Sequence, residues 1–334
     1  HASPISEGAK RLCLIALHFA PARGSQFRPA SIQKEGESPM KKMTKAQRIE
    51  NRDGWLFMAP AMVIFLTLVV FAIIASFFLA FTEWNFLSGL KGIKFVAFDN
   101  FIKLFTRDRK FKMALGNTIL YAVTVAPISI LLALVFAYMI NDKVYFKKFN
   151  RLCFFVPYIS SMVALAAVFR FLFRSDGPIN LILTTFGVQE VPKWLTNSTL
   201  CKIPIICVMV YAGIGFNLIV YMAALQNVPR ELYEAAEVDG ASKGKQFFKI
   251  TLPMLSPTTF YLCIVRLIAA FKAFSAINIM GSGGNAPSLV TEIYANAFTS
   301  YKFGYASAEA WVLVAVILVV TAIQFWGQKK WVHY

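Results

Sequence analysis

Long apolar stretches alternate with short polar segments along this chain. Six of the stretches contain few charged residues, and each has about the 20 residues that a helix needs to cross roughly 30 Å of hydrocarbon. They are 55–81, 115–140, 152–173, 203–226, 258–280 and 306–327. The pattern predicts an all-α integral membrane protein whose main domain, residues 55–334, has six transmembrane helices.

Composition supports this interpretation and limits the others. The 334 residues are 57% hydrophobic and 15% charged, whereas soluble domains carry about 25% charged residues. The net charge of +17 raises the possibility of a nucleic-acid partner. The cations, however, lie in short segments beside the apolar runs, with no basic domain or RNA-binding aromatic motif between them. We therefore attribute the charge to membrane orientation and expect no nucleic-acid binding.

The N-terminal residues differ from the rest. Residues 1–39 hold only a short apolar run after Lys10 and Arg11, too short to span a membrane. We expect this segment to be a disordered leader or to derive from cloning, with a natural start at Met40 or Met43. Residues 40–54 then form a basic N-terminal tail on the cytoplasmic side.

Charge asymmetry predicts the orientation. With six spans both termini lie on one side, and that side holds 15 Lys and Arg from Met40 onward against 11 on the other. The positive-inside rule then places both termini in the cytoplasm of a bacterial inner (cytoplasmic) membrane protein. The 83–114 segment opposes this assignment, because seven of the 11 outer cations lie there.

The segment 227–257 is the longest loop that this topology places in the cytoplasm. A helix is predicted to start near Pro229, with Asn227 available as a cap and acidic residues in its first turn. Gly240 breaks it, and Ser242 can cap a second helix that Pro253 and Pro257 stop. A hairpin with small side chains on one face suits docking into a groove of a partner protein. The other interpretation is an amphipathic hairpin that lies on the membrane surface.

The spacing within this loop is that of a known signature. Glu234-Ala235-Ala236 is followed by three residues, Gly240, nine residues, Ile250, one residue and Leu252-Pro253. This resembles in full the EAA motif of binding-protein-dependent ABC importer permeases, and the similarity to that family extends over nearly everything from Trp55 to the end. It strongly favours docking over the membrane-surface alternative.

Further segments resemble the carbohydrate branch of this family, and within it the first of two unlike permeases of maltose-, lactose- and glycerol-phosphate-type importers. The similar segments are 115–120, 155–159, 169–173, 283–287 and 303–308. The chain departs from the branch in two places. Its 283–287 run lacks the usual Gly-Gly-Gly-Pro, and the large extracellular insertion of the maltose-type subunit is absent.

The resemblance implies a mechanism and a set of partners. The loop would form coupling helices that sit in a cleft of a separate ATPase, through Glu234, Ala235, Ala236, Gly240, Ile250, Leu252 and Pro253. Glu234 would face a basic or polar group there, and Gly240 would make the turn. The implied partners are an ATPase dimer, a second non-identical permease, an extracytoplasmic solute-binding protein and a carbohydrate, with transport by alternating access in the lipid bilayer.

No enzymatic site is expected in the chain itself. It contains no Gly-x-x-x-x-Gly-Lys-Ser/Thr phosphate loop, since Gly244-Lys245-Gln246 lacks the preceding glycine and the hydroxyl. We therefore expect no catalytic residue, metal or cofactor here, and place ATP and Mg²⁺ on the partner. The five cysteines match neither a metal cluster nor a disulfide framework.

Four polar residues inside the predicted spans are candidates for the substrate path: Arg266, Lys272, Asn217 and Asn278. A charge within the bilayer costs about 2.5–3.5 kcal/mol on insertion scales, so such side chains usually face water or a partner. The cations indicate a cavity for an anionic or heavily hydroxylated substrate. They could instead snorkel or pair with the second permease, and the asparagines could equally hold helices together.

Two further groups lie outside these positions. Arg170 and Arg174 are close to the outer end of their span, where we expect them to anchor at the membrane interface. Tyr294, Phe298, Tyr301 and Tyr305 recur at helical spacing. They could receive the binding protein, stack on sugar or pack against neighbouring helices.

These observations favour import of carbohydrate, specifically of acidic oligosaccharides such as alginate-like uronate oligomers, on account of Arg266 and Lys272. A neutral oligosaccharide or glycerol phosphate remains open. An ion-coupled carrier would be expected to have an intramembrane acid or an inverted repeat, and neither is evident. An intramembrane enzyme would need a motif such as His-Glu-x-x-His, and no histidine falls in a predicted span.

Overall fold

The computed structural model describes residues 45–141, 147–281, 285–329 and 332. The expected leader, 1–39, and residues 40–44 of the basic tail lie outside these ranges, as do Gly283 and Gly284. The chain divides into two units, residues 1–63 and 64–334. The described part of the first unit belongs to one helix, α2 (Lys45–Ile64).

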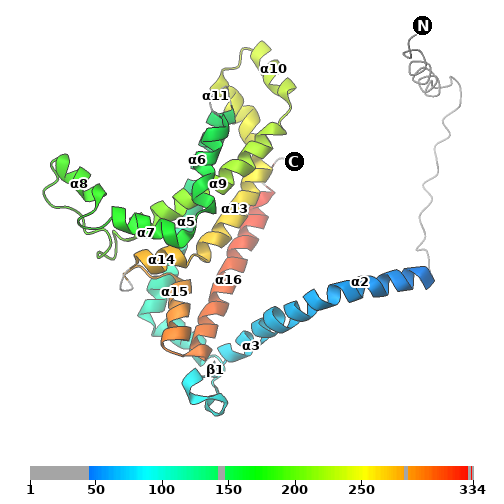
Figure 1. The fold of residues 1–334 in the computed structure, drawn as a ribbon, viewed down its shortest axis with the longest axis vertical. Coiled ribbons are helices and arrows are strands. Elements are labelled where there is room, and N and C mark those ends of the chain that lie inside the picture. Colours follow the sequence, from blue (N-terminus) through cyan, green and yellow to red (C-terminus); the bar gives the residue numbers. More distant parts are fainter. Residues whose placement is uncertain (1–44, 142–146, 282–284, 330–331, 333–334) are drawn as a thin grey trace, which may run out of the picture. The chain divides into compact units, whose positions relative to one another are not determined.

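The second unit is built from helices, with one small two-stranded sheet (Figure 1). Its first half contains η2 (Phe65–Val70), α3 (Phe71–Ala80), β1 (Thr82–Glu83), η3 (Phe86–Ser88), η4 (Leu90–Gly92), β2 (Lys94–Phe95), α4 (Asp99–Thr106), α5 (Arg109–Asn141), α6 (Lys147–Ile159), α7 (Met162–Leu172) and α8 (Pro178–Thr185). Its second half contains α9 (Lys202–Gln226), α10 (Arg230–Val238), α11 (Lys243–Gln246), η5 (Phe247–Thr251), α12 (Leu252–Met254), α13 (Ser256–Phe271), α14 (Ser275–Met280), α15 (Leu289–Tyr294), η7 (Ala295–Thr299) and α16 (Phe303–Gln328).

Helices α5, α9 and α13 pack together at the centre of this unit. The buried face of α5 is a stripe of small side chains, Ala122, Ala126, Ser129, Ala133 and Ala137, which recur every three or four residues. Small residues let helix backbones approach closely, and in a membrane such packing replaces the hydrophobic effect as the force between helices. This explains why α9, whose buried face carries Ile205, Leu218 and Tyr221, lies so close to α5.

Length and composition confirm the membrane assignment. Within the described ranges four helical segments are long and apolar enough to cross a membrane: Ile49–Ala80, Arg109–Ile140, Lys202–Gln226 and Phe303–Gln328. Two bent pairs, Leu152–Ile159 with Met162–Leu172 and Lys243–Met254 with Ser256–Phe271, raise the number to six if each counts as one span.

The bends correct two of the predicted spans. The predicted span 152–173 turns by 104° where α6 gives way to α7, because Ser161 has an extended backbone with ψ 127°. The predicted span 258–280 is not one helix either. α13 ends at Phe271, and α14 begins only at Ser275, after Phe274 leaves the helical conformation. The predicted spans do contain polar residues at both places, Ser160-Ser161 and Lys272, but these residue types do not by themselves break a helix.

Candidate functional site

The α10–α12 hairpin, residues Arg230–Met254, projects from one end of the helical bundle, opposite the end that bears β1 (Figure 1). Its first helix ends in a Schellman motif. Gly240 N–H donates to Glu237 O at 3.0 Å, and Ala241 N–H donates to Ala236 O at 2.9 Å. Gly240 has φ +71°, a conformation that costs other residues about 1–2 kcal/mol. The predicted glycine turn is therefore confirmed, with its physical cause.

The second arm of the hairpin is held against the first and against α5. The hydroxyls of Tyr233 and Thr251 lie 2.9 Å apart in a hydrogen bond, and Gln246 Nε2 donates to Ala241 O at 3.2 Å. The ring of Phe247 packs edge-on against Tyr138 of α5, with 4.7 Å between centroids. A movement of the hairpin is thereby connected to the membrane helices.

The capping expected from the sequence is only partly right. Asn227 ends α9, and Pro229 occupies the N-cap position of α10. Ser242 does precede α11, but its side chain makes no capping hydrogen bond. Asn227 is displaced because α9 runs on to Gln226, which leaves too little chain for a separate cap.

The candidate coupling residues divide by exposure. Glu234, Ala235 and Gly240 are exposed, while the others are half-buried on the side that faces the bundle: Ala236, Ile250, Leu252 and Pro253. Val238, part of the small apolar face expected for the first helix of the loop, is 89% exposed at the end of α10. Its side chain adds apolar surface to the exposed part of the hairpin.

A second candidate site lies where α13 ends. A pocket of about 180 Å³ is lined by Val125, Met162, Met209, Arg266, Ala269, Ala270, Ala273, Phe274, Ser275 and Ala276, and we call it the Arg266 pocket. Arg266 is its only charged lining residue. The side chain forms no ion pair within the described residues, and its buried Nε has no hydrogen-bond partner there. An unsatisfied guanidinium beside a cavity is poised to receive an acceptor from a ligand.

Gly213 of α9 makes room for this guanidinium. A Cβ added at Gly213 would collide with Nη2 of Arg266. Neighbouring Gly215 plays a different role, since a Cβ there would collide with the carbonyl oxygen of Phe154 in α6. The sequence interpretation missed Gly213, although a glycine within an apolar span is itself a signal of close approach.

The structure does not bring the other three path candidates into this pocket. Lys272 is the exposed C-cap residue of α13, and Asn278 is exposed on α14. Asn217 is fully buried between α9 and α5, where Nδ2 donates to Ser129 Oγ at 3.3 Å. This bond joins α9 to α5, while Oδ1 of Asn217 has no hydrogen-bond partner among the described residues.

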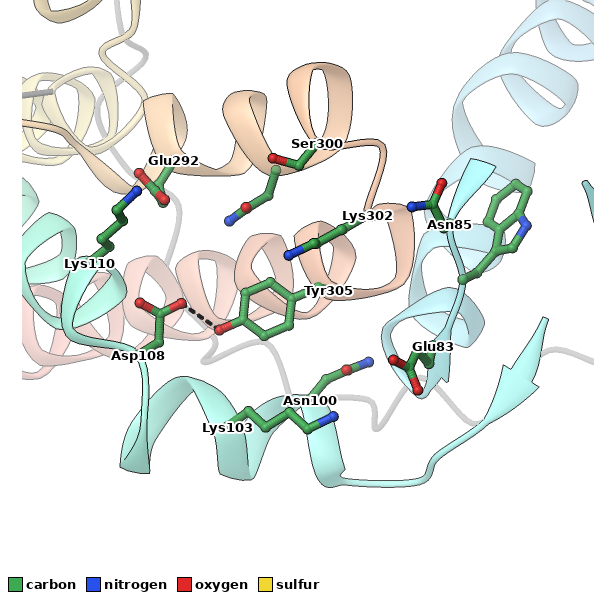
Figure 2. Close-up of a pocket in the computed structure, with 12 residues that line it drawn as sticks. Glu83, Asn85, Asn100, Lys103, Asp108, Lys110, Glu292, Ser300, Lys302 and Tyr305 are labelled. Carbon is green, nitrogen blue, oxygen red and sulfur yellow. Dashed lines mark hydrogen bonds between the residues drawn. The ribbon is translucent and has the colours of Figure 1, made fainter. Parts of the chain in front are cut away.

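A third candidate site, the Tyr305 pocket, lies at the β1 end of the second unit. It measures about 530 Å³ and is lined by Glu83, Trp84, Asn85, Asn100, Lys103, Asp108, Lys110, Glu292, Asn296, Ser300, Lys302 and Tyr305. Figure 2 shows the Tyr305 hydroxyl directed at Asp108, to which it donates at 2.6 Å. Burial raises the pKa of the Glu292 carboxyl, and the charge of nearby Lys110 partly offsets this rise.

The aromatic residues predicted to share a face separate here. Tyr305 lines the pocket, whereas Tyr294 stacks with Phe298 and Phe274 at centroid distances of 5.1 and 5.0 Å. Tyr301 is exposed with φ +57°. The helical spacing is interrupted because α16 begins only at Phe303.

Comparison with known proteins identifies the family. Residues 127–332 match the model of the binding-protein-dependent transport system inner membrane component. The chain belongs to this family. The EAA motif and its coupling helix are features of that family, so the prediction of an ABC importer permease is confirmed.

Three similar proteins illustrate the relationship. The probable ABC transporter permease protein YesP of Bacillus subtilis is 33% identical, with 90% of this chain and 97% of the relative covered. The lactose transport system permease protein LacF of Rhizobium radiobacter is 32% identical over 85% of this chain and 96% of its own. A solved bacterial ABC transporter involved in import of the acidic polysaccharide alginate has a chain that aligns with a TM-score of 0.71 and 26% identity, over 86% and 99% of the two chains.

Proposed function

We propose that this permease imports carbohydrate as one of two unlike transmembrane subunits of an ABC transporter. Names among its relatives support this class: they include lactose, arabinooligosaccharide and sn-glycerol-3-phosphate transport permeases. The remaining parts of the proposal are a second permease, an ATPase dimer that binds ATP and Mg²⁺, and an extracytoplasmic binding protein. Both termini lie in the cytoplasm.

The α10–α12 hairpin is the proposed contact with the ATPase. Its exposed Glu234, Ala235 and Val238 face away from the bundle, and the Schellman turn at Gly240 holds the tip in one conformation. The hydrogen bond between Tyr233 and Thr251 and the Phe247–Tyr138 contact transmit its displacement to α5. Closure of the ATPases would thereby rock the membrane helices between two accessible states.

Within carbohydrates, the proposed substrate is an acidic oligosaccharide that contains uronates. The observation that carries this choice is Arg266, a guanidinium without a partner among the described residues, in a pocket of otherwise uncharged side chains. A guanidinium binds a carboxylate with two parallel hydrogen bonds. The similarity to the alginate importer supports the same choice.

A neutral oligosaccharide or glycerol phosphate is the second candidate, because the curated relatives carry those names. Both classes fit the family equally well. A neutral oligosaccharide offers Arg266 hydroxyls but no anionic group, whereas glycerol phosphate carries a phosphate that a guanidinium also binds. The charge of the substrate is therefore the property to test.

The experiment is binding-protein-stimulated ATP hydrolysis by the whole complex in proteoliposomes. The binding protein is loaded either with an oligouronate or with a neutral oligosaccharide of equal length. We expect the oligouronate to stimulate ATP hydrolysis. Arg266→Gln should reduce that stimulation about tenfold, as loss of a charged hydrogen bond does, and should not reduce any stimulation by the neutral sugar to the same extent. Lys272→Gln removes an exposed cation that does not line the pocket, and it should change stimulation less than about twofold.

The opposite result is equally clear. Stimulation by the neutral sugar and not by the oligouronate would overturn the acidic preference while leaving the carbohydrate class intact. Stimulation by neither, in a complex that assembles and hydrolyses ATP, would overturn both oligosaccharide candidates and favour glycerol phosphate.

A further inference from the structure

Two more arginines line a pocket at the C-terminal end of α7, the end that lies away from the bend. It measures about 550 Å³ and is lined by Ala167, Arg170, Phe171, Arg174, Ser175, Asp176, Leu195 and Thr196; we call it the Arg170 pocket. The sequence interpretation assigned Arg170 and Arg174 to anchoring at the membrane interface. The structure places both in the lining of an open pocket, a position that is compatible with anchoring.

The two arginines are in different electrostatic situations. Arg174 is paired with Asp176 through two contacts, Nε to Oδ1 at 3.0 Å and Nη2 to Oδ2 at 3.1 Å. Arg170, one turn earlier, forms no ion pair or hydrogen bond with the described residues. Because the Arg174–Asp176 pair is neutral as a unit, the charge left in the pocket is that of the Arg170 guanidinium.

The chain around the lining residue Ser175 is held in place by Asn180, which does not itself line the pocket. Asn180 is 2% exposed, and its Nδ2 donates to the carbonyl oxygens of Ser175 and Pro192 at 3.1 and 3.2 Å. Trp194 Nε1 donates to Asn180 Oδ1 at 2.8 Å. Each hydrogen bond that is already made in the free protein lowers the ordering cost of binding a ligand there.

The opposite wall is tied to the segment that follows α14. Asn285 Nδ2 donates to the carbonyl oxygen of Thr196 at 3.1 Å, across 89 residues of sequence. The hydroxyls of Ser175 and Thr196 and the ring of Phe171 complete the lining. The hydroxyls match the polar edge of a uronate ring, and the free guanidinium matches its carboxylate. The exposed aromatic ring matches its apolar face.

Helix α7 connects this pocket to the first one. Met162 lines the Arg266 pocket and Arg170 lines the Arg170 pocket. Their separation of eight positions corresponds to about 12 Å along the helix axis. An extended oligosaccharide of several linked rings covers that distance, so one molecule can lie along both pockets.

We infer that the Arg170 pocket is a second subsite for carboxylated sugars, in which the Arg170 guanidinium binds a uronate carboxylate of the same oligosaccharide that reaches Arg266. This subsite rests on the proposed import of acidic oligosaccharides. A lipid phosphate is also an oxyanion that Arg170 could bind. The hydroxyls and the Arg174–Asp176 pair in the lining favour a hydroxylated ligand over a lipid with its acyl chains.

The test is direct binding of a fluorescent oligouronate to the whole complex in lipid nanodiscs, without the binding protein. We expect the Kd to rise about tenfold in Arg170→Gln, as loss of a charge-assisted hydrogen bond predicts. Arg170→Lys keeps the charge and should recover part of the affinity. Arg107→Gln removes an exposed arginine outside the pocket and should leave the Kd within about twofold.

Two comparisons separate the possible failures. If the wild-type complex binds the oligouronate and Arg170→Gln binds it equally well, the subsite is wrong while the proposed substrate class stands. If the wild type binds a carboxyl-reduced version of the sugar but not the oligouronate, the acidic preference fails and the subsite fails with it. An Arg170→Gln effect that appears only in nanodiscs of anionic lipid, or that is the same for the carboxyl-reduced sugar, would assign Arg170 to lipid anchoring and overturn the subsite.

Discussion

The α10–α12 hairpin and the Arg266 pocket are built in opposite ways. The hairpin consists of residues 230–254, and its turn is closed by backbone hydrogen bonds between positions five residues apart or fewer. The Arg266 pocket takes its lining from α5, α7, α9, α13 and the turn before α14, a span from Val125 to Ala276. One is local structure that presents its side chains to water, and the other is a gap left between packed helices.

This difference determines what a substitution can do at each site. In the hairpin, the position that matters most needs a backbone conformation, because nothing lies within 4 Å of a Cβ added at Gly240. Around Arg266 the decisive property is space, because Gly213 is where α9 lets the guanidinium lie. Backbone geometry therefore limits which residues the hairpin turn tolerates, whereas packing limits which residues the pocket tolerates. Substitutions at Gly240 and Gly213 distinguish these two constraints.

The largest effect is expected at the hairpin turn. Gly240→Pro cannot adopt the φ of +71° found there, because the proline ring holds φ near −65°. We therefore expect stimulated ATP hydrolysis and uptake to fall about tenfold or more. Gly240→Asn is the matched control, because asparagine tolerates this conformation best after glycine. Uptake by proteoliposomes measures both variants.

The contrary outcome is simple to recognise. Full uptake by Gly240→Pro, in a complex that has assembled with the ATPase, would show that the turn geometry is dispensable for coupling. Equal loss in Gly240→Pro and Gly240→Asn would show that the absence of a side chain matters there and that the left-handed backbone does not.

A smaller effect is expected at Gly213→Ala, which forces the Arg266 guanidinium to move. We expect the oligouronate Kd to rise about threefold, less than after removal of a charged hydrogen-bond donor. Gly116→Ala is the matched control, since a Cβ at this glycine of α5 meets nothing within 4 Å. Alanine favours a helix over glycine by roughly 0.5–1 kcal/mol, so the control should retain stability and affinity.

Binding of oligouronate and of its carboxyl-reduced counterpart by nanodisc complexes measures this pair. A Gly213→Ala complex that keeps the wild-type Kd for both sugars would show that the guanidinium position is unimportant. A loss that is equal for the two sugars would indicate general disturbance of the packing between α9 and α13.

The smallest effect is expected at Tyr233→Phe, which removes the hydrogen bond to Thr251 and leaves the ring in place. One such bond contributes about 0.5–1.5 kcal/mol, so the hairpin should open more often and stimulated ATP hydrolysis should fall about twofold. Amide hydrogen exchange across residues 230–254, compared with exchange in α5, checks the cause. This local role would be contradicted if exchange became faster throughout the protein, or if exchange in the hairpin kept its wild-type rate.

Prediction from sequence succeeded where the signal was carried by neighbouring residues. The apolar runs indicated the membrane helices, and Gly240 indicated the turn, because a glycine that follows a short helix is a local requirement. Prediction from sequence failed for the capping role of Asn227, for the bend near Ser161 and for the break after Phe271. At these places the course of the chain depends on how far adjacent helices extend.

Among the candidate path residues, sequence could identify polar side chains in apolar runs but not where they lie. Arg266 faces a cavity, Asn217 is enclosed between two helices, and Lys272 is exposed, although all three lie in predicted spans. For Lys272 the reason is the end of α13 one residue earlier. For Asn217 it is Ser129 of α5, a partner 88 residues away.

The amino-acid sequence was sufficient for the membrane class, the family and the hairpin with its glycine turn. Apolar length, the EAA spacing and a left-handed backbone position are all properties of contiguous chain. Tertiary structure alone decided that Arg266 lies against Gly213 without a partner among the described residues, and that Arg170 lines a pocket together with Ser175 and Thr196. The reason is physical: a pocket is the space that distant helices leave on packing, and no single helix carries that information.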